Sequence, residues 1–331
     1  METRELGRTG RQVGVIGLGC WQLGGDWGTV DDAQALAVLH AAVDAGVTFL
    51  DTADVYGDGR SEQLIGRFLR ERGGRGTGGL TVATKAGRRA DPHVPEAYTA
   101  ANLRAWTDRS RRNLGVDRLD LVQLHCPPAA VYGTDAVFDA LDGLVEDGVT
   151  AAYGVSVETA DEALAAIARP HVATVQIILN AFRLKPLERA LPAAREAGVG
   201  IIARVPLASG LLSGTYDTHT TFAPNDHRSY NRHGEAFDVG ETFSGVPFEV
   251  GVQAAKEIAG IASAGVPTSA FALRWIIDQP GVSVVIPGAR TPDQARSNAA
   301  SAEVPPLTTE QQDAVRRVYD ERIRGYVHGH W

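Results

Sequence analysis

The sequence lacks the residue patterns of disulfide-rich, metal-binding and membrane-spanning proteins. It has two cysteines, Cys20 and Cys126, in 331 residues, which excludes a disulfide framework and a CxxC metal site. Its nine histidines form no HExxH motif, so no metal is expected. No apolar run reaches the length of about 18 residues that a membrane span requires. The polar start METRELGRTG is unlike a signal peptide, and we therefore expect a cytoplasmic protein.

Positively charged residues are fewer than negatively charged ones. Lys and Arg together number 32 against 40 Asp and Glu, so the formal net charge is −8. This global field argues against nucleic-acid binding, although a small anionic cofactor needs only local positive charge. The composition is otherwise that of a globular protein, with 44% hydrophobic residues. Residues 1–331 can form one large core, because α/β barrels of this size are commonly single domains.

Short apolar runs rich in β-branched residues recur along the chain and predict eight strands. They are continuously apolar rather than alternating, which is typical of strands buried on both faces of a parallel sheet. The runs are Val13–Leu18, Val47–Leu50, Leu80–Thr84, Leu119–Leu124, Ala152–Val155, Val172–Leu179, Gly200–Val205 and Val282–Ile286.

Amphipathic, Ala-rich stretches lie between these runs and predict helices, most of which end near a glycine or proline. They are Asp31–Ala45, Ser61–Glu71, Glu96–Leu114, Thr134–Asp147, Glu158–Ala168, Pro186–Ala197, Thr268–Asp278 and Pro292–Ala302. Two further helices, Glu249–Ala262 and Thr308–Arg324, stand outside the repeat. We interpret Arg4–Arg11 as a hairpin that plugs one end, and Gly214–Pro247 as a long polar loop of the functional or disordered kind.

The alternation of strands and helices favours a (β/α)8 TIM barrel of the α/β class, with an N-terminal hairpin and long loops at the C-terminal face. The alternative is an open Rossmann or flavodoxin-like sheet with a second domain. A Rossmann sheet carries GxGxxG after its first strand, whereas Gly17-Leu18-Gly19 lacks the third glycine and is followed by Cys20. The barrel is therefore the preferred fold.

Four polar residues follow successive predicted strands, at the end of the barrel where catalysis takes place in this fold. Asp51 and Tyr56 follow the second strand, Lys85 the third and His125 the fourth. A nearby ammonium stabilises a phenolate and makes the phenol easier to deprotonate, and a carboxylate holds the ammonium in place. A neutral imidazole can orient a carbonyl group, so the four residues together suit an electrophilic pocket for a C=O oxygen.

Each of these residues alone has an ordinary structural explanation. Asp51 suits a turn cap, Tyr56 an aromatic at the rim of a loop, and Lys85 a strand-end lysine that extends to solvent. His125 suits a buried histidine with satisfied hydrogen bonds. Their joint occurrence at neighbouring strand ends favours the catalytic interpretation.

The segments that carry these residues closely resemble the aldo-keto reductase superfamily. They are GVTFLDTADVYGDGRSEQLIG, LTVATKAG and LDLVQLHCPP, and the resemblance extends from RELGRTGRQVGVIGLGCWQLGG to VVIPGARTPDQARSNAAS. It implies a catalytic tetrad of Asp51, Tyr56, Lys85 and His125. It also implies an NADPH-binding barrel that interconverts carbonyls and alcohols reversibly.

The same resemblance implies a set of cofactor contacts in four segments of the chain. They are Ser156, Gln176, Arg204, Pro206, Leu207, Gly210, Leu211, Gly214, Ile286, Gly288, Arg290, Gln294 and Asn298. Ser156 and Gln176 match the positions that hold the nicotinamide amide, and Val157 stands where the family often has Asn. Arg204 stands where an aromatic often stacks on the nicotinamide, and a planar guanidinium can also stack. Arg290 is expected to bind the ribose 2′-phosphate, which favours NADPH over NADH.

The substrate is expected to be a small carbonyl compound or sugar, held by Trp21, Tyr56 and His125 and by loops at the barrel mouth. Trp27, the Gly214–Pro247 loop and Trp331 are further candidates. Two rival functions stay open: a non-catalytic NADPH-sensing subunit, and an NADPH-dependent epimerase or dehydratase acting on a sugar or natural-product intermediate. The sequence does not indicate the oligomeric state.

Overall fold

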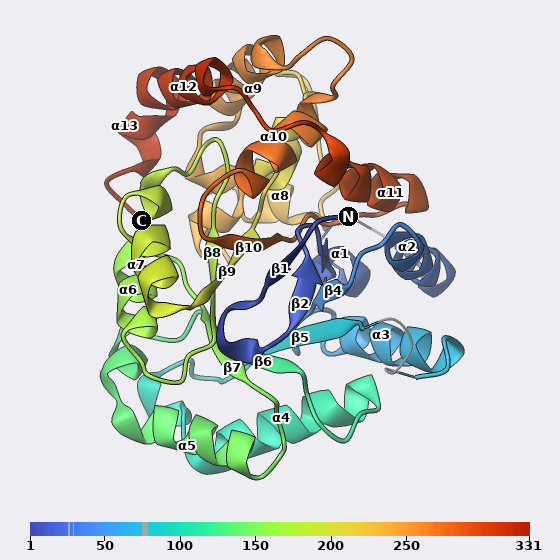
Figure 1. The fold of residues 1–331 in the computed structure, drawn as a ribbon, viewed down its shortest axis with the longest axis vertical. Helices are drawn as coiled ribbons and strands as arrows, with labels where there is room; N and C mark the ends of the chain where they lie inside the picture. Colours follow the sequence, from blue (N-terminus) through green and yellow to red (C-terminus); the bar gives the residue numbers. More distant parts are fainter. Residues whose placement is uncertain (26, 29, 75–78) are drawn as a thin grey trace.

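A small antiparallel hairpin closes one end of the molecule. The computed structural model describes residues 1–25, 27–28, 30–74 and 79–331, and the hairpin pairs β1 (Thr3–Glu5) with β2 (Gln12–Gly14). Figure 1 looks onto this end, with the hairpin in front of the strands. Leu6 and Val13 are fully buried and pack on side chains inside the barrel, namely Phe49, Ala83, Leu121, Ile202, Val284 and Ile286. The predicted plug is thus confirmed.

Eight parallel strands form the barrel, in the spatial order β10-β9-β8-β7-β6-β5-β4-β3. They are β3 (Leu18–Gly19), β4 (Phe49–Asp51), β5 (Thr81–Ala86), β6 (Leu121–His125), β7 (Tyr153–Ser156), β8 (Thr174–Ile178), β9 (Gly200–Arg204) and β10 (Val282–Val285). Parallel bridges Ile16↔Val285 and Gly19↔Gly288 join the last strand to the first and close the ring. The predicted (β/α)8 fold is confirmed.

The first predicted strand, Val13–Leu18, is wrong in its boundaries. Val13 pairs with Arg4 in the hairpin, and only Leu18 and Gly19 pair with β4. The chain changes partners between these two points because Val13 must face the barrel interior to seal it. An apolar run records burial but not the partner strand, so the sequence could not show this break.

Helices surround the barrel between consecutive strands (Figure 1). They are α2 (Asp32–Asp44), α3 (Arg60–Glu71), α4 (Ala100–Leu114), α5 (Asp135–Glu146), α6 (Ala160–Ile167), α7 (Ala190–Ala197), α10 (Thr268–Ile277) and α11 (Pro292–Ala300). Outside the repeat lie α1 (Trp21–Gly24), α8 (His227–Tyr230), α9 (Phe248–Ile261), α12 (Thr309–Val318) and α13 (Arg324–Val327). Across the described ranges, no helix has both the length and the apolar character to cross a membrane.

Two predicted helices begin later in the structure than the sequence suggested. The helix expected from Glu96 starts at Ala100, because the Thr99 side chain accepts a hydrogen bond from the Asn102 N–H and caps it there. The helix expected from Pro186 starts at Ala190, after a 3-10 turn over Lys185–Leu187. In both cases a proline that suits a first helical turn belongs to a preceding 3-10 turn.

Residues 214–247 form a chain of short turns rather than a featureless loop. They include α8 and 3-10 turns at Val239–Glu241 and Phe243–Gly245. The Trp331 indole N–H donates to Asp238 at 3.1 Å, and the Arg183 guanidinium stacks 3.8 Å from the Trp331 ring. These contacts fix the second half of the segment against the body of the protein.

Candidate active site

A cavity of about 550 Å³ opens at the C-terminal ends of the strands. Asp51, Tyr56 and His125 line it, and Lys85 lies buried behind them. The predicted cofactor residues that line it are Ser156, Gln176, Arg204, Pro206, Leu207, Gly210, Ile286, Gly288, Arg290, Gln294 and Asn298. Leu211 is instead buried beneath this wall, and Gly214 ends a 3-10 helix beside it. The strand ends therefore bring together residues that the sequence scatters over 250 positions of the chain.

Asp51 and Lys85 form a buried ion pair at one side of the cavity. Asp51 is the last residue of β4, and Lys85 lies next to the end of β5. The Lys85 ammonium donates to Asp51 Oδ1, to the Thr52 carbonyl at 3.0 Å and to the Tyr56 hydroxyl at 3.3 Å. The other Asp51 oxygen accepts from Gln176 at 2.8 Å and from Gln123 at 3.1 Å. Every charged atom of the pair thus has a partner.

Tyr56 lies in the turn between β4 and α3, and two contacts hold that turn. The Asp54 N–H donates to the Lys85 carbonyl at 3.2 Å, which ties the turn to β5. On its other side, Gly57 has a φ of +60°, and a Cβ atom there would lie 2.2 Å from the Gly24 carbonyl oxygen. Glycine at position 57 therefore permits a close approach to α1 that a larger residue would block.

Burial and charge act in opposite directions on the two residues that share this hydrogen bond. Burial raises the pKa of Tyr56 above its ordinary value of 10.0, although the Lys85 ammonium lowers it. Burial by itself would lower the pKa of Lys85, but Asp51 and Tyr56 raise it above its ordinary range. Lys85 lowers the pKa of Tyr56 as expected, but burial raises it by more. Tyr56 is therefore a protonated phenol that faces a charged ammonium.

His125 is the last residue of β6, and its ring stands at 88° to the Tyr56 ring with the centroids 6.0 Å apart. Burial, together with the positive charges of Arg88, Lys85 and Arg204, lowers the pKa of His125 well below 6.5. The imidazole is therefore neutral near pH 7, as an orienting group for a carbonyl requires.

Aromatic side chains form the wall of the cavity next to Tyr56. The Trp21 ring stacks on the Tyr56 ring at 6.0 Å and meets the Trp27 ring edge-on at 5.5 Å. Trp21, Tyr56 and His125, the predicted substrate residues, all line the cavity. Trp331 does not; it packs on Arg183 behind the 214–247 segment.

Four charged residues, Arg88, Glu158, Arg204 and Glu241, form a second ionic group, which we call the mouth cluster. Arg204 donates to Glu158 Oε2 at 2.7 Å and to the Val157 carbonyl at 3.1 Å, and Arg88 donates to Glu241 Oε1 at 2.8 Å. Arg204 also lies 3.8 Å from the same Glu241 oxygen. Glu158 Oε1 and Arg204 Nε have no hydrogen-bond partner among the described residues.

The two acids of the mouth cluster differ in protonation. Burial and the nearby Glu241 raise the pKa of Glu158 to about 7, with Arg204 opposing them. Burial would raise the pKa of Glu241 as well, but Arg88 and Arg204 lower it to about 2. Oxygen atoms of both acids and the Cys126 sulfur lie within 4.8 Å of one another. Arg204 contacts both acids and Arg88 contacts Glu241, so this group is a poor site for a cation. The absence of a metal stays a prediction.

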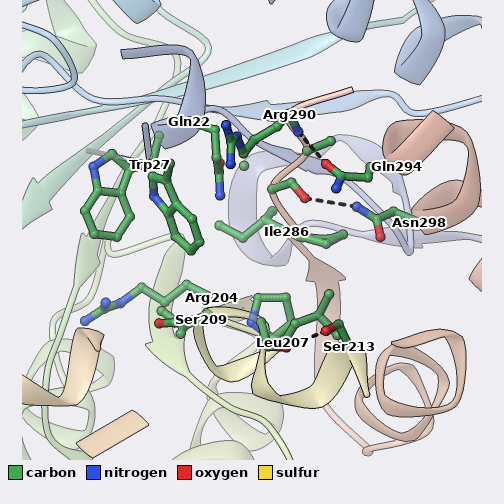
Figure 2. A pocket seen from close by; sticks show the side chains of 18 of the residues that line it. Gln22, Trp27, Arg204, Leu207, Ser209, Ser213, Ile286, Arg290, Gln294 and Asn298 are labelled. Atoms are coloured by element: carbon green, nitrogen blue, oxygen red, sulfur yellow. Dashed lines mark hydrogen bonds between the residues drawn. The ribbon is translucent and has the colours of Figure 1, made fainter. Parts of the chain in front are cut away.

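The cofactor end of the cavity is built where β10 leads into α11. The Thr291 side chain caps α11, and Gln294 Oε1 accepts from the Arg290 backbone N–H at 2.8 Å. Asn298 donates to the Gly288 carbonyl at 3.1 Å (Figure 2). The Arg290 Nε is buried and, within the described chain, makes no hydrogen bond. Figure 2 also shows the Arg204 side chain directed away from Gln294 and Asn298.

Strained backbone marks the wall formed by the chain after β9. Val205, Ala208 and Ser209 have φ values of 52°, 47° and 54°, a region that non-glycine residues seldom occupy. The Ser209 hydroxyl accepts from the Phe243 N–H at 3.1 Å and donates to the Glu241 carbonyl at 3.1 Å. The strain is thus held in place by the 214–247 segment, and strain of this kind concentrates at functional sites.

Sequence reasoning missed several residues of this site. Gln123, which donates to Asp51, lies within the LDLVQLHCPP segment two residues before His125, but the sequence analysis did not single it out. Glu158 precedes α6 and Glu241 ends a 3-10 turn, and only the structure shows them beside Arg204. Arg88 follows the LTVATKAG segment directly, and a search for charges near Lys85 could have found it.

The chain is similar to known proteins in sequence and in fold. The profile of the Aldo/keto reductase family matches residues 15–320. The chain is 30% identical over 322 residues to the Aldo-keto reductase YhdN of Bacillus subtilis (strain 168), covering 95% of this chain and 91% of that protein. It is 28% identical to a probable voltage-gated potassium channel subunit beta of Arabidopsis thaliana, covering 93% of each. The structure of the glycerol dehydrogenase of Gluconobacter oxydans matches with a TM-score of 0.79 and 30% identity, over 97% of this chain and 96% of that chain.

Proposed function

The chain belongs to the aldo/keto reductase family, and we propose that it reduces aldehyde or ketone carbonyls to alcohols with NADPH, in a reversible reaction. One observation carries the proposal. The Tyr56 hydroxyl lies 3.3 Å from the buried Lys85 ammonium, beside a cavity that His125 also lines. A phenol bonded to an ammonium can give up its proton to an oxygen that gains negative charge, because the ammonium stabilises the phenolate that is left.

The residues of the cavity suit NADPH. The orphaned Arg290 Nε and the orphaned Gln22 Oε1 both belong to residues that line the cavity, where a bound ligand could supply their partners. The Gln176 side-chain amide donates to Asp51 and to Gln123, so its Oε1 remains to accept from the nicotinamide amide. Arg290 would hold the 2′-phosphate, and when bound the nicotinamide supplies the hydride.

The chain's own groups then handle the proton. Tyr56 donates its hydroxyl proton to the carbonyl oxygen as the alcohol forms, and Lys85 stabilises the resulting phenolate. Asp51 keeps Lys85 charged and fixes its position. The aromatic wall of Trp21 and Trp27 binds the substrate and excludes water from the reacting oxygen. In the reverse direction the phenolate accepts the alcohol proton.

The direct test is Tyr56→Phe, assayed by loss of reduced-nicotinamide absorbance with a panel of aldehydes, ketones and sugars. We expect turnover to fall roughly 10²–10⁴-fold while the NADPH dissociation constant stays unchanged, because only the proton donor is lost. Tyr326→Phe, at an exposed tyrosine, is the matched control. Wild-type turnover in Tyr56→Phe would refute the assignment.

Cofactor choice is a second expectation. Wild-type kcat/KM should be higher with NADPH than with NADH, because Arg290 lines the cavity and its guanidinium would hold the extra phosphate. Arg290→Ala should reduce this preference by about tenfold, since one charge-assisted contact is lost. Equal kcat/KM values for the two cofactors in the wild-type protein would contradict the role of Arg290.

One relative supports a different function. Because a probable channel subunit is 28% identical, an NADPH-sensing subunit without a metabolic reaction is the second candidate. A wild-type protein that binds NADPH but turns over no member of the carbonyl panel would favour it. Product analysis separates the remaining rival, an epimerase or dehydratase, because that product would not be the simple alcohol. A cytoplasmic location also stays a prediction.

A further inference from the structure

The inference concerns Arg88, which follows β5 and makes a contact that the proposed mechanism does not use. Its Nη1 lies 3.3 Å from His125 Nε2 and donates to Glu241 Oε1 at 2.8 Å. Glu241 is nearly buried and is the anionic member of the mouth cluster, so it fixes the guanidinium in place. Both partners of Nη1, His125 and Glu241, line the cavity.

The chemistry of the two groups fixes the state of the imidazole. A guanidinium has only N–H donors, so the ring nitrogen that faces it must offer a lone pair. A neutral imidazole carries one N–H, which must then sit on Nδ1 of His125. That Nδ1 is buried and has no hydrogen-bond partner in the described chain.

The surroundings of His125 reinforce this state. Lys85 from β5, Arg88 and His93 from the segment after it, and Arg204 from β9 all lower the pKa of the imidazole, in addition to burial. The Tyr56 ring meets the imidazole edge-on, and Glu241 pairs with Arg88 and Arg204. No described group next to His125 stabilises its protonated form directly.

We propose that Arg88 is a positioning residue for His125, which rests on the proposed function. Arg88 occupies Nε2, keeps the imidazole neutral with its proton on Nδ1, and places a fixed positive charge on the His125 side of the carbonyl oxygen. Tyr56 then supplies the proton, and the guanidinium, rather than an imidazole N–H at Nε2, balances the negative charge that develops there.

The test measures the tautomer first. The full chain is labelled with ¹⁵N-histidine, loaded with NADPH, and its His125 signals are identified by their loss in His125→Gln. The nitrogen shifts should report a proton on Nδ1 and a bare Nε2 throughout pH 5 to 9. A proton on Nε2 in the NADPH-bound wild-type protein would overturn the inference, whatever the protein's activity.

Two variants then test the consequence. Arg88→Met should lower kcat roughly 10²-fold with little change in KM or in NADPH affinity, and His125 should acquire a titration below pH 7 that kcat follows. Arg88→Lys, which keeps charge and donor, should recover most of kcat and the flat pH profile. Arg104→Met, which removes a surface arginine paired with Asp147, is the control. A wild-type kcat and pH profile in Arg88→Met would refute the inference.

The tautomer measurement also separates this inference from the proposed function. If the wild-type chain turned over no carbonyl compound, the proposed function would fail while the nitrogen shifts still decided the state of His125. If carbonyl reduction were intact but Nε2 carried the proton, only the role of Arg88 would fail.

Discussion

The Asp51–Lys85 pair and the mouth cluster, the two ionic groups at the cavity, differ in how completely their charged atoms are hydrogen-bonded. The Asp51–Lys85 pair has one charge of each sign, side chains 3% and 1% exposed, and a partner for every oxygen and for the ammonium. The mouth cluster has two arginines, an ionised Glu241 and Glu158, whose pKa is raised to about 7. Its side chains are 8–23% exposed, and atoms of Glu158 and Arg204 have no hydrogen-bond partner among the described residues. Buried charges are costly unless they are paired and hydrogen-bonded. The described chain meets this requirement in full for the first group and only in part for the second.

The difference matches the roles that we propose for the two groups. A proton donor needs its supporting ammonium at one distance throughout the reaction, and the saturated pair provides this. The mouth cluster borders both the cofactor wall, through Arg204, and the substrate side, through Glu241. Incomplete hydrogen bonding there leaves positions that a ligand can complete.

The largest expected effect comes from breaking the saturated pair. Lys85→Met should lower kcat roughly 10³-fold and reduce the free energy of unfolding by about 3–5 kcal/mol, because Asp51 is left as an unpaired buried carboxylate. Steady-state kinetics and urea unfolding measure the two effects. Lys256→Met, at an exposed position of α9, serves as the control.

A double variant sharpens this prediction. Asp51→Asn combined with Lys85→Met removes both charges and should regain part of the lost stability without regaining turnover. If Lys85→Met alone were as stable as the wild-type protein, the pair would not be the constraint described above.

An intermediate effect is expected at the mouth cluster. Arg204→Ala should raise the NADPH dissociation constant about tenfold and reduce the free energy of unfolding by about 1–3 kcal/mol, because Glu158 and Glu241 lose a shared cation. Fluorescence titration measures the first effect and urea unfolding the second. An unchanged dissociation constant would confine Arg204 to the cluster and end its proposed role as a platform for the nicotinamide.

The smallest effect is a pH dependence. The pKa of Glu158 is about 7 in the folded protein against 4.5 ordinarily, so the folded state binds the proton more tightly than the unfolded state. Stability should therefore fall as pH rises from about 4.5 to 7, by roughly 1–2 kcal/mol from this group. Glu241 does not contribute in that window, because its pKa is lowered to about 2 and its stabilising effect is lost only below its ordinary value.

The control for this pH dependence is Glu158→Gln, measured by urea unfolding at pH 5 and pH 7.5. Asp54 is also buried, with a pKa raised to about 7, and contributes in the same direction to both proteins. The difference between the two proteins therefore isolates Glu158. Parallel curves for wild type and Glu158→Gln would show that Glu158 is charged in the folded state.

The sequence predicted the saturated pair more completely than the mouth cluster, for a physical reason. Asp51, Tyr56, Lys85 and His125 each follow a recognisable apolar run, and strand ends meet at one edge of a barrel. Glu241 lies within a segment that has no periodicity, so nothing in its neighbourhood indicated that it faces Arg88 and Arg204. Arg204 was identified from the sequence, but its partners were not.

The surroundings of a buried residue also could not be predicted from the sequence. The residue types correctly indicated that Lys85 lowers the pKa of Tyr56, but not that burial outweighs it. In the same way, the apolar run at Val13–Leu18 indicated a buried strand and not the change of partner within it. Both depend on what surrounds a residue in three dimensions rather than on its neighbours in the chain.

The N-terminal hairpin closes one end of the barrel. Leu6 and Val13 pack into the far end of the barrel, and residues of the 214–247 segment form part of the wall of the cavity at the other end. Trp331 contacts Asp238 and Arg183 and so ties this segment to a part of the chain that is distant in sequence.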